Sequence, residues 1–337
     1  MTTIVDIANK LKISKSTVSR ALTNSSDVSA KTRERVLRTA KEMNYSVNAY
    51  ARNLVTNRSH LISFMIPDIA DAFYQKIAQS ADEYLSNAGY SMFYRNVKRD
   101  PKESLKFLKQ AMEFHMDGVF ITLDDWTDEI CDFIANMNIP VISLRRKTPD
   151  RLKEIVPYVD CDYYEGLDNT ITYLSSYGHK EIGYIAFETI VGKERISAYE
   201  KICSKYGLAM HMIRNRSFQD AGVRIEVGYN SAKKLINENP EITAILSGDD
   251  QLAIGDLKYC NEAGIRVPED ISIMGCDDRS IGSLFCIQLT TLGQQREEAG
   301  LLAGQLMIDM IEHPGFHESI NVPMIIRERR TVGRAAR

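Results

Sequence analysis

Long apolar runs are missing from this sequence of 337 residues, in which no stretch of about 18 consecutive apolar residues occurs. The first residues, MTTIVD, also lack the basic start and apolar core of a secretory signal. These absences exclude an ordinary membrane-spanning helix and predict a cytoplasmic protein without a membrane partner. Because 44% of the residues are hydrophobic, we expect two or three folded domains rather than disorder.

Cysteine is sparse and shows no metal-binding or disulfide pattern. The six cysteines stand singly, without any C-x-x-C, at Cys131, Cys161, Cys203, Cys260, Cys276 and Cys286. This spacing favours reduced thiols in a core over metal ligands or disulfides. His313 and His317 are separated by Pro314 and Gly315, which would break the helix of a paired metal site. We therefore expect a surface loop there, and neither a metal nor a cofactor.

Motifs of catalysis and nucleotide binding are also absent. The sequence has no G-x-G-x-x-G after a predicted strand, and no G-x-x-x-x-G-K-[ST], H-E-x-x-H or G-x-S-x-G motif. An enzyme is therefore the least favoured class of protein.

The formal net charge of −3 conceals an asymmetry along the chain. Residues 1–60 contain 11 lysines and arginines against four acidic residues, which gives +7 and leaves −10 for the remainder. A basic head on an acidic body suits attraction to a polyanion. Charge alone is equally compatible with a solvated basic surface.

Three short helices are expected in the head, each with an apolar face. Thr3 and Ser14 are placed as N-caps, Asp6 completes a capping box with Thr3, and the third helix is expected to begin at Ser29. The apolar residues at helical spacing are Ile4, Ile7, Ala8 and Leu11, then Val18, Ala21 and Leu22, then Val36, Leu37, Ala40 and Met43. A tight turn joins the first two helices, and basic side chains face outward from the second. This arrangement predicts a helix-turn-helix that fits a DNA major groove.

From residue 61 the pattern changes to short apolar runs that alternate with amphipathic helices. Strands are predicted at 61–66, 118–121, 140–144, 182–186, 244–246 and 271–274. Two such series indicate an α/β body of two lobes with doubly wound parallel sheets, and hence a multi-domain protein with an all-α head. Ligands of such sheets bind beyond the carboxyl ends of the strands, so we expect the site in a cleft between the lobes.

Several sequence blocks closely resemble the lactose-repressor (LacI/GalR) family. In the head they are TIVDIA at 3–8, ISKSTVSRAL at 13–22 and VSAKTRERV at 28–36. In the body they are IPDI at 66–69, MDGV at 116–119, GH at 178–179, RVPEDIS at 266–272, GCDD at 275–278 and LTT at 289–291. Their order along the whole chain makes the resemblance specific.

The resemblance implies a transcriptional regulator, most often a repressor. Its partners would be double-stranded operator DNA of near-palindromic sequence, a second copy of the chain, and a small effector, a sugar or sugar phosphate. The predicted domains are a head at 1–46, a hinge helix and linker at 47–59, and an effector-binding and dimerisation body at 60–337. The first lobe takes 60–157 and 290–321, and the second takes 158–289 and 322–337. The chain ends without a leucine-heptad tail, so a dimer is expected.

The family position of the second head helix implies which residues read DNA. Lys15 and Ser16 fall where base-reading side chains vary, and Ser19 and Arg20 lie on the same helix. Lys15 can donate to guanine O6 and N7, with a phosphate contact as the alternative. The residues implied to position phosphates are Thr17, Ser29, Thr32 and Tyr45.

Asn48, Ala51 and Leu54 lie where the family forms its hinge helix. Leu54 corresponds to the leucine that wedges into the minor groove, although it could instead pack against its dimer mate. Val47 replaces the usual proline, which predicts a less rigid entry to the hinge.

The residues implied to line the effector cleft are Phe73, Tyr74, Arg195, Asp249 and Asp277. Helix capping is the alternative role of both aspartates. Arg145 stands where relatives often carry an acid and joins this set. With Lys193, Arg195 and Arg296 nearby, it leads to the hypothesis of an anionic effector such as a sugar phosphate.

A sugar-binding protein without operator function is the alternative from another class, because the same two-lobed fold serves that role. The basic head would have no purpose in such a protein, which favours the regulator.

Overall fold

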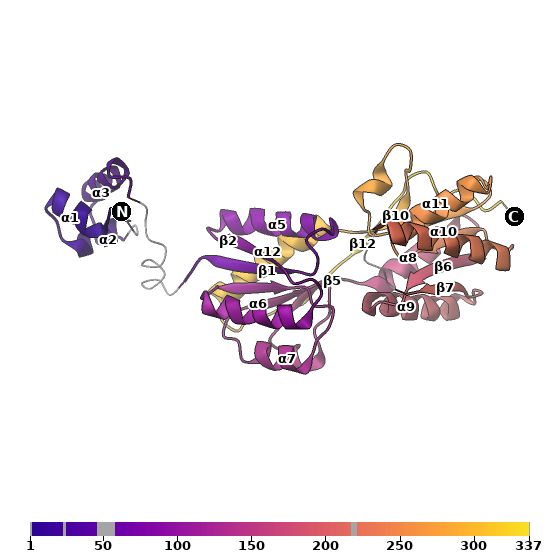
Figure 1. Ribbon diagram of the computed structural model, residues 1–337, viewed down its shortest axis with the longest axis horizontal. Helices are drawn as coiled ribbons and strands as arrows, with labels where there is room; N and C mark the ends of the chain where they lie inside the picture. Colours follow the sequence, from indigo (N-terminus) through magenta and orange to yellow (C-terminus); the bar gives the residue numbers. More distant parts are fainter. Residues whose placement is uncertain (1, 23–24, 46–57, 217–220, 337) are drawn as a thin grey trace.

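The computed structural model describes residues 2–22, 25–45, 58–216 and 221–336. The head contains α1 (Ile4–Leu11), α2 (Lys15–Leu22) and α3 (Ala30–Glu42), as Figure 1 shows. The predicted capping box is present, since the Asp6 amide donates to Thr3 Oγ1 over 3.3 Å and the Thr3 amide to Asp6 Oδ2 over 2.8 Å. The Thr17 amide likewise donates to the predicted cap Ser14, and the Thr32 amide donates to Ser29, which caps α3.

The head has a small core of its own. Ile7, Val18 and Val36 are fully buried at its centre. The prediction for Leu37 is wrong, because this side chain is 49% exposed. Leu37 follows Val36 directly, and a step of about 100° along the helix turns it away from the core.

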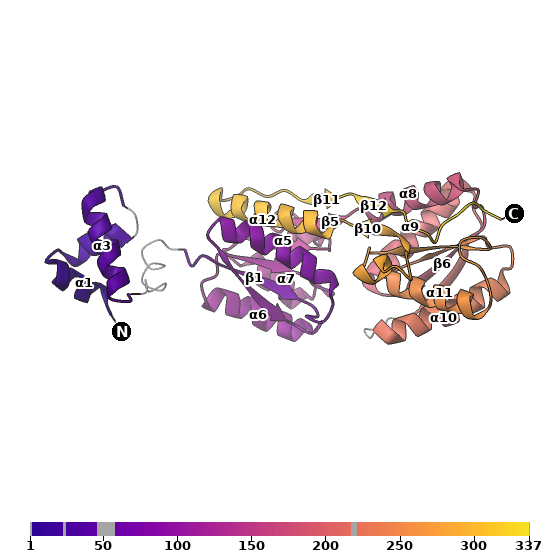
Figure 2. The same cartoon turned by 90° about the horizontal axis from the view of Figure 1, so that it is seen from above.

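The body consists of two lobes, each a six-stranded sheet between helices (Figures 1 and 2). The first sheet has the order β11-β5-β4-β3-β1-β2 and is parallel throughout. Its strands are β1 (Leu61–Ile66), β2 (Ser91–Asn96), β3 (Gly118–Ile121), β4 (Val141–Leu144), β5 (Tyr158–Cys161) and β11 (Ile320–Val322). α5 (Phe73–Asn87) and α12 (Arg296–Glu312) cover one face, and α6 (Pro101–Glu113) and α7 (Asp128–Ala135) cover the other.

The second sheet has the order β12-β10-β9-β8-β6-β7, and only β12 runs antiparallel to its neighbour among these strands. The strands are β6 (Ile182–Phe187), β7 (His211–Asn215), β8 (Ala244–Ser247), β9 (Ser272–Cys276), β10 (Thr290–Gln294) and β12 (Met324–Arg327). α8 (Tyr163–Ser176) and α9 (Ile190–Tyr206) cover one face, and α10 (Ala221–Glu238) and α11 (Asp250–Glu262) cover the other. The predicted fold class of a helix-turn-helix head with two doubly wound lobes is therefore confirmed.

The predicted lobe boundaries at 157/158 and 289/290 are wrong, each by one strand. β5 pairs with β4 and β11 in the first sheet, and β10 pairs with β9 and β12 in the second. The chain therefore passes between the lobes after β5, after β10 and between β11 and β12, the last close to the predicted 321/322. A short apolar run predicts a strand but not the sheet that the strand joins.

Two further observations complete the fold. Five of the cysteines are buried as predicted, whereas Cys286 is exposed. None of the described helices is long and apolar enough to cross a membrane.

The two helices α10 and α11 approach closely at a pair of glycines. A Cβ on Gly255 would overlap the carbonyl oxygen of Ile225, and one on Gly228 would overlap that of Leu252. We expect Gly255→Ala to lower the free energy of unfolding by about 1–3 kcal/mol, because overpacking outweighs the gain in helix propensity. Urea denaturation of the full chain measures this, with the exposed Lys234→Ala on α10 as control. A variant as stable as the control would contradict the close packing.

Candidate functional site

The outer face of α2 carries the residues predicted to read DNA. Lys15, Ser16 and Arg20 are exposed there, and Ser19 is partly exposed. The Ser16 and Thr17 hydroxyls lie 2.8 and 2.7 Å from Ser14 Oγ at the start of the helix. The N-terminal turn of α2 therefore presents a lysine and several hydroxyls to the outside, as base and phosphate contacts require.

The residues predicted to position phosphates lie at the start and beyond the end of α3. Ser29 Oγ and Thr32 Oγ1 are 2.9 Å apart on the surface at the first turn. Tyr45 packs partly against the head core, which leaves only part of its side chain accessible. The predicted hinge residues Asn48, Ala51 and Leu54 lie outside the described residues.

A cavity of about 270 Å³ lies between the two lobes, near the lower end of the usual range for small-molecule sites. Its first-lobe wall consists of Asp71, Tyr74, Arg99, Thr122, Asp124, Leu144, Arg145 and Arg146. Its second-lobe wall consists of Tyr184, Ala186, Phe187, Thr189, Val191, Gly192, Arg195, Arg224, Gly248, Asp249, Asp277 and Arg279. Many of these residues stand at or just beyond the carboxyl ends of strands, where doubly wound sheets bind ligands.

Arg195 and Asp277 form a buried ion pair in the second-lobe wall. The Arg195 guanidinium donates to Asp277 Oδ1 over 3.1 Å and also to the Gly248 carbonyl. Gln294 Nε2 donates to the same Asp277 oxygen over 2.7 Å. Burial raises the pKa of Asp277, but Arg195, Arg279 and Arg145 outweigh that effect and hold its pKa below the ordinary value.

Asp249 caps a helix and also lines the cavity. Its Oδ1 caps α11 by accepting from the Leu252 amide over 2.9 Å, and its Oδ2 accepts from Arg224 over 2.5 Å. Asp277 is used differently, since its carboxylate is taken up by Arg195 and Gln294 and the next helix, a 3-10 turn at Ser280–Ser283, follows Arg279. The capping alternative is thus confirmed for Asp249 only.

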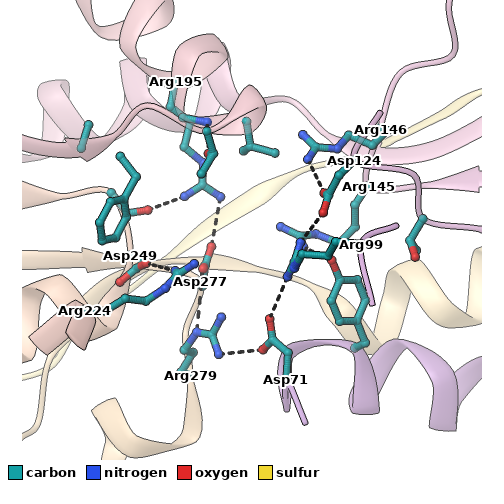
Figure 3. Close-up of a pocket in the computed structure, with 18 of the residues that line it drawn as sticks. Asp71, Arg99, Asp124, Arg145, Arg146, Arg195, Arg224, Asp249, Asp277 and Arg279 are labelled. Carbon is teal, nitrogen blue, oxygen red and sulfur yellow. Dashed lines mark hydrogen bonds and ion pairs between the residues drawn. The ribbon is translucent and has the colours of Figure 1, made fainter. Parts of the chain in front are cut away.

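One ion pair joins the two lobes across the cavity. Arg279 Nη1 of the second lobe donates to Asp71 Oδ1 of the first over 3.0 Å. Figure 3 shows Asp71 and Arg279 facing one another, with a second contact from Asp71 to Arg99. Burial raises the pKa of Asp71, yet the positive charges of Arg279 and Arg145 and the Phe73 amide lower it overall. The contact therefore joins two ionised groups whose separation changes with the angle between lobes.

Three predicted residues lie elsewhere than expected. Phe73 is 1% exposed and does not line the cavity, because the Arg145 guanidinium covers its ring at 3.8 Å. Lys193 is exposed outside the cavity. Arg296 is buried and donates to the Asp278 carbonyl over 2.5 Å. Arg145, Tyr74, Arg195, Asp249 and Asp277 do line it.

The sequence interpretation missed six charged lining residues, which are Asp71, Arg99, Asp124, Arg146, Arg224 and Arg279. Arg146 and Arg279 directly follow positions that were predicted, at the end of β4 and after the GCDD block, so proximity in sequence was a usable signal. Arg99 follows β2, an edge strand that was not predicted.

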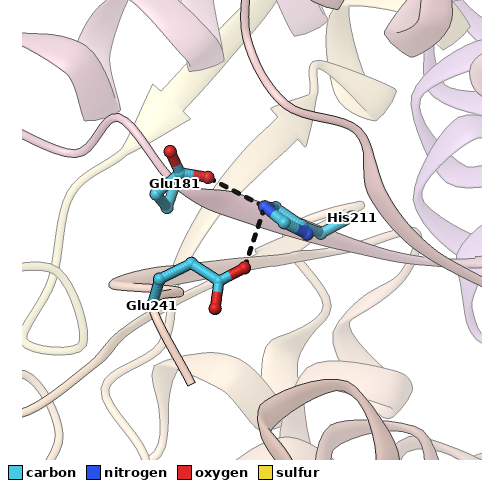
Figure 4. Close-up of side chains that lie close together, drawn as sticks. All are labelled: Glu181, His211 and Glu241. Carbon is cyan, nitrogen blue, oxygen red and sulfur yellow. Dashed lines mark hydrogen bonds and ion pairs between the residues drawn. The ribbon is translucent and has the colours of Figure 1, made fainter. Parts of the chain in front are cut away.

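Glu181, His211 and Glu241 lie at the amino ends of β6, β7 and β8, at the end of the second sheet away from the cavity. Figure 4 shows their side chains facing one another. Ligand atoms of Glu181, His211 and Glu241 lie within 4.8 Å of one another, close enough to hold a divalent cation. Asn239 Nδ2 donates to Leu235, so its Oδ1 accepts from His211 Nδ1 over 2.9 Å. His211 Nε2 lies 2.8 Å from Glu181 Oε2 and 3.7 Å from Glu241 Oε1. The cluster is separate from the cavity.

Comparison with known proteins gives two matches to family models. Residues 3–48 match the model of bacterial regulatory proteins of the lacI family, and residues 171–332 match a periplasmic binding protein-like domain. The chain is 28% identical to the HTH-type transcriptional repressor PurR of Pasteurella multocida, over 92% of each chain. It is 27% identical to the ribose operon repressor of Halalkalibacterium halodurans, over 97% of each.

The fold also matches a solved structure along nearly its full length. The lac repressor dimer bound to operator and the anti-inducer ONPF superposes with a TM-score of 0.85. The alignment covers 98% of this chain and 99% of that one, at 23% sequence identity.

Proposed function

Since the chain belongs to the lacI family of bacterial regulatory proteins, we propose that it binds a near-palindromic operator as a homodimer, under the control of a small effector in the cleft. The family model matched by residues 3–48 and the relatives that align with nearly the whole chain both belong to the class of transcriptional regulators. In this proposal the protein acts in the cytoplasm as a repressor. The observation that carries it is the exposed N-terminal turn of α2 within a match to the family's head.

The head supports operator binding because one group of exposed residues suits contacts to bases and another suits contacts to phosphates. Lys15 and Ser16 are exposed at the start of α2, where a recognition helix meets base edges. Ser29 and Thr32 place hydroxyls at the start of α3, suited to phosphates. A dimer doubles this surface and reads two half-sites.

The cleft supports effector control because both lobes contribute to one cavity. A ligand that binds there contacts groups on both sides of the Asp71–Arg279 pair and favours one angle between the lobes. The ribose operon repressor and the lac repressor complex are relatives whose names connect them to small sugars or an anti-inducer. We propose that this chain also binds a hydroxylated ligand of similar size.

Operator binding is tested by fluorescence anisotropy with palindromic fragments from upstream of its own gene or a neighbouring operon. We expect nanomolar affinity for one fragment and a loss of about a thousandfold between 50 and 200 mM salt, because phosphate contacts release counterions. A scrambled fragment of equal composition is the control. Equal affinity for both fragments, with tight binding of a sugar, would favour the sugar-binding protein instead.

A further inference from the structure

The charged side chains that line the cleft carry a net positive charge. Among the described residues that line it, the arginines are Arg99, Arg145, Arg146, Arg195, Arg224 and Arg279. The acids are Asp71, Asp124, Asp249 and Asp277. Six positive and four negative groups leave the described wall with an excess of two positive charges.

The four carboxylates are already engaged by arginine. Asp124 accepts from Arg99 over 2.5 Å and from Arg146 over 2.9 Å. The other pairs are Asp71 with Arg279, Asp249 with Arg224 and Asp277 with Arg195. Burial opposes ionisation of Asp124, but its two arginines lower its pKa overall. These aspartates therefore neutralise arginines within the wall and leave one arginine without an acid.

Arg145 is that arginine. Among the described residues it has no carboxylate within 4.0 Å. Its guanidinium stacks on Phe73 at 3.8 Å and donates from Nη1 to Tyr74 Oη over 3.2 Å. Its buried Nε has no acceptor in the part of the chain that the structure describes. Aromatic faces attract a cation but do not neutralise it, so the positive charge of Arg145 stays available to a ligand.

The backbone at Arg145 is shaped to present this side chain. Its φ of 64° lies in the left-handed region, which a residue with a side chain adopts at a cost of order 1 kcal/mol or more. The Arg145 amide donates to the Val159 carbonyl over 2.9 Å, which holds the turn at the end of β4. Figure 3 shows Arg145 beside Arg99 and Arg146 on the first-lobe side of the pocket.

Arg146 adds a second donor at the same wall. Its Nη2 binds Asp124, while its buried Nη1 has no acceptor among the described residues. Two guanidinium groups that line the same cavity match the several oxygens of a carboxylate or phosphate, whereas a neutral hydroxyl accepts without compensating charge.

We propose that the effector carries an anionic group, a carboxylate or a phosphate, that binds Arg145 and Arg146 while its remainder meets Arg195 and Asp277. This inference rests on the proposed function, because it takes the cleft as the effector site. It extends the sequence hypothesis by naming the wall that holds the charge. Arg195, which that hypothesis included, is neutralised by Asp277, and Lys193 and Arg296 lie off the cavity.

Thermal unfolding of the full chain in low millimolar sodium phosphate or sodium acetate, against sodium chloride of equal ionic strength, tests the site. We expect one of these anions to raise the unfolding temperature by about 3 °C at a concentration near ten times its Kd. We expect Arg145→Gln to remove this shift. We expect Arg145→Lys to retain part of it, because lysine keeps the positive charge but lacks the paired N–H donors of a guanidinium group. Arg151→Gln is the matched control, because Arg151 pairs with Asp128 and Asp132 outside the cavity and its loss leaves the shift unchanged.

The outcomes separate the sources of the charge. A shift with acetate alone assigns a carboxylate, and a larger shift with phosphate assigns a phosphate. No shift beyond chloride in the wild type, or an undiminished shift in Arg145→Gln, overturns the proposal. If Arg145→Gln fails to fold, the affinity of Arg145→Lys for the anion is compared with that of the wild type. Equal affinities would overturn the proposal.

Operator anisotropy on the same preparations keeps the two proposals apart. Wild type and the control Arg151→Gln are expected to bind operator equally without anion, since Arg151 lies in the body and outside the cavity. Operator binding without an anion shift refutes only the anionic effector. An anion shift without operator binding refutes the proposed function and leaves the anion site standing.

Discussion

Asp277→Asn is expected to lower the free energy of unfolding by about 3–5 kcal/mol, because it leaves the Arg195 guanidinium buried without its counter-ion. Both side chains are nearly inaccessible, with exposures of 8% for Arg195 and 7% for Asp277. Urea denaturation of the full chain, followed by circular dichroism, measures the effect on the second lobe.

The exposed pair of Arg266 and Asp270 is the matched control on the same lobe. Their side chains are 71% and 38% exposed, so water solvates each charge when the other is removed. We expect Asp270→Asn to change stability little. Equal effects at Asp277 and Asp270 would show that burial of the Arg195 pair is not what stabilises this lobe.

The double variant Arg195→Met with Asp277→Leu isolates the pair itself. Replacing both charges by apolar groups removes the uncompensated ion, so we expect most of the lost stability to return. Effector binding is not expected to return, because the polar groups of this wall are gone.

The effect of Asp277→Asn depends on pH in a definite direction. The folded-state pKa of Asp277 is lower than its unfolded value of about 3.9, so its ionisation stabilises the fold above that pH. This contribution is lost as the pH falls through the folded-state pKa. The difference between wild type and variant should thus be full at pH 6 and shrink below pH 4, whereas a constant difference would assign it to packing.

Lys15→Ala is expected to weaken binding to the preferred operator by about 1–3 kcal/mol, or roughly five- to 150-fold, and to relax base preference at one position of each half-site. The reason is that Lys15 stands exposed on the first turn of α2, the part of a recognition helix that enters the major groove. Anisotropy with an operator library substituted at single positions measures this.

Thr32→Val is the matched control in the head. It removes a hydroxyl at the start of α3 with little change in shape and should weaken all fragments alike. The salt dependence should stay the same, because the hydroxyl carries no charge and releases no counterion. A loss at Lys15 that is equally uniform would identify Lys15 as a phosphate contact.

The central strands of the body were predictable because they are buried on both faces. β1, β3, β4, β6, β8 and β9 are mostly apolar and were all predicted. The edge strands β2 and β7 are partly exposed, with patterns too polar to stand out. β5, β10, β11 and β12 lie beside the crossings between lobes and were missed as well. Polar residues interrupt β5 at Asp160 and β10 at Thr290 and Thr291, and β11 and β12 have only three and four residues.

The sequence by itself determined the head and the class of protein. Capping residues and apolar spacing act within one or two helical turns, so Thr3 with Asp6, and Ser29 with Thr32, specify their helices from neighbours a few positions away. The resemblance of the head and body blocks then indicated a regulator, and the comparisons confirmed that class.

Only the tertiary structure decided the electrostatics of the cleft. Asp71 meets Arg279 across 208 positions of sequence, and Arg145 rests on the Phe73 ring from a different strand end. Such contacts depend on the sheet that each strand joins and on three passages of the chain between lobes. The sequence therefore shows which residues are charged. Only the fold shows which of them pair, and hence which arginine remains without a carboxylate.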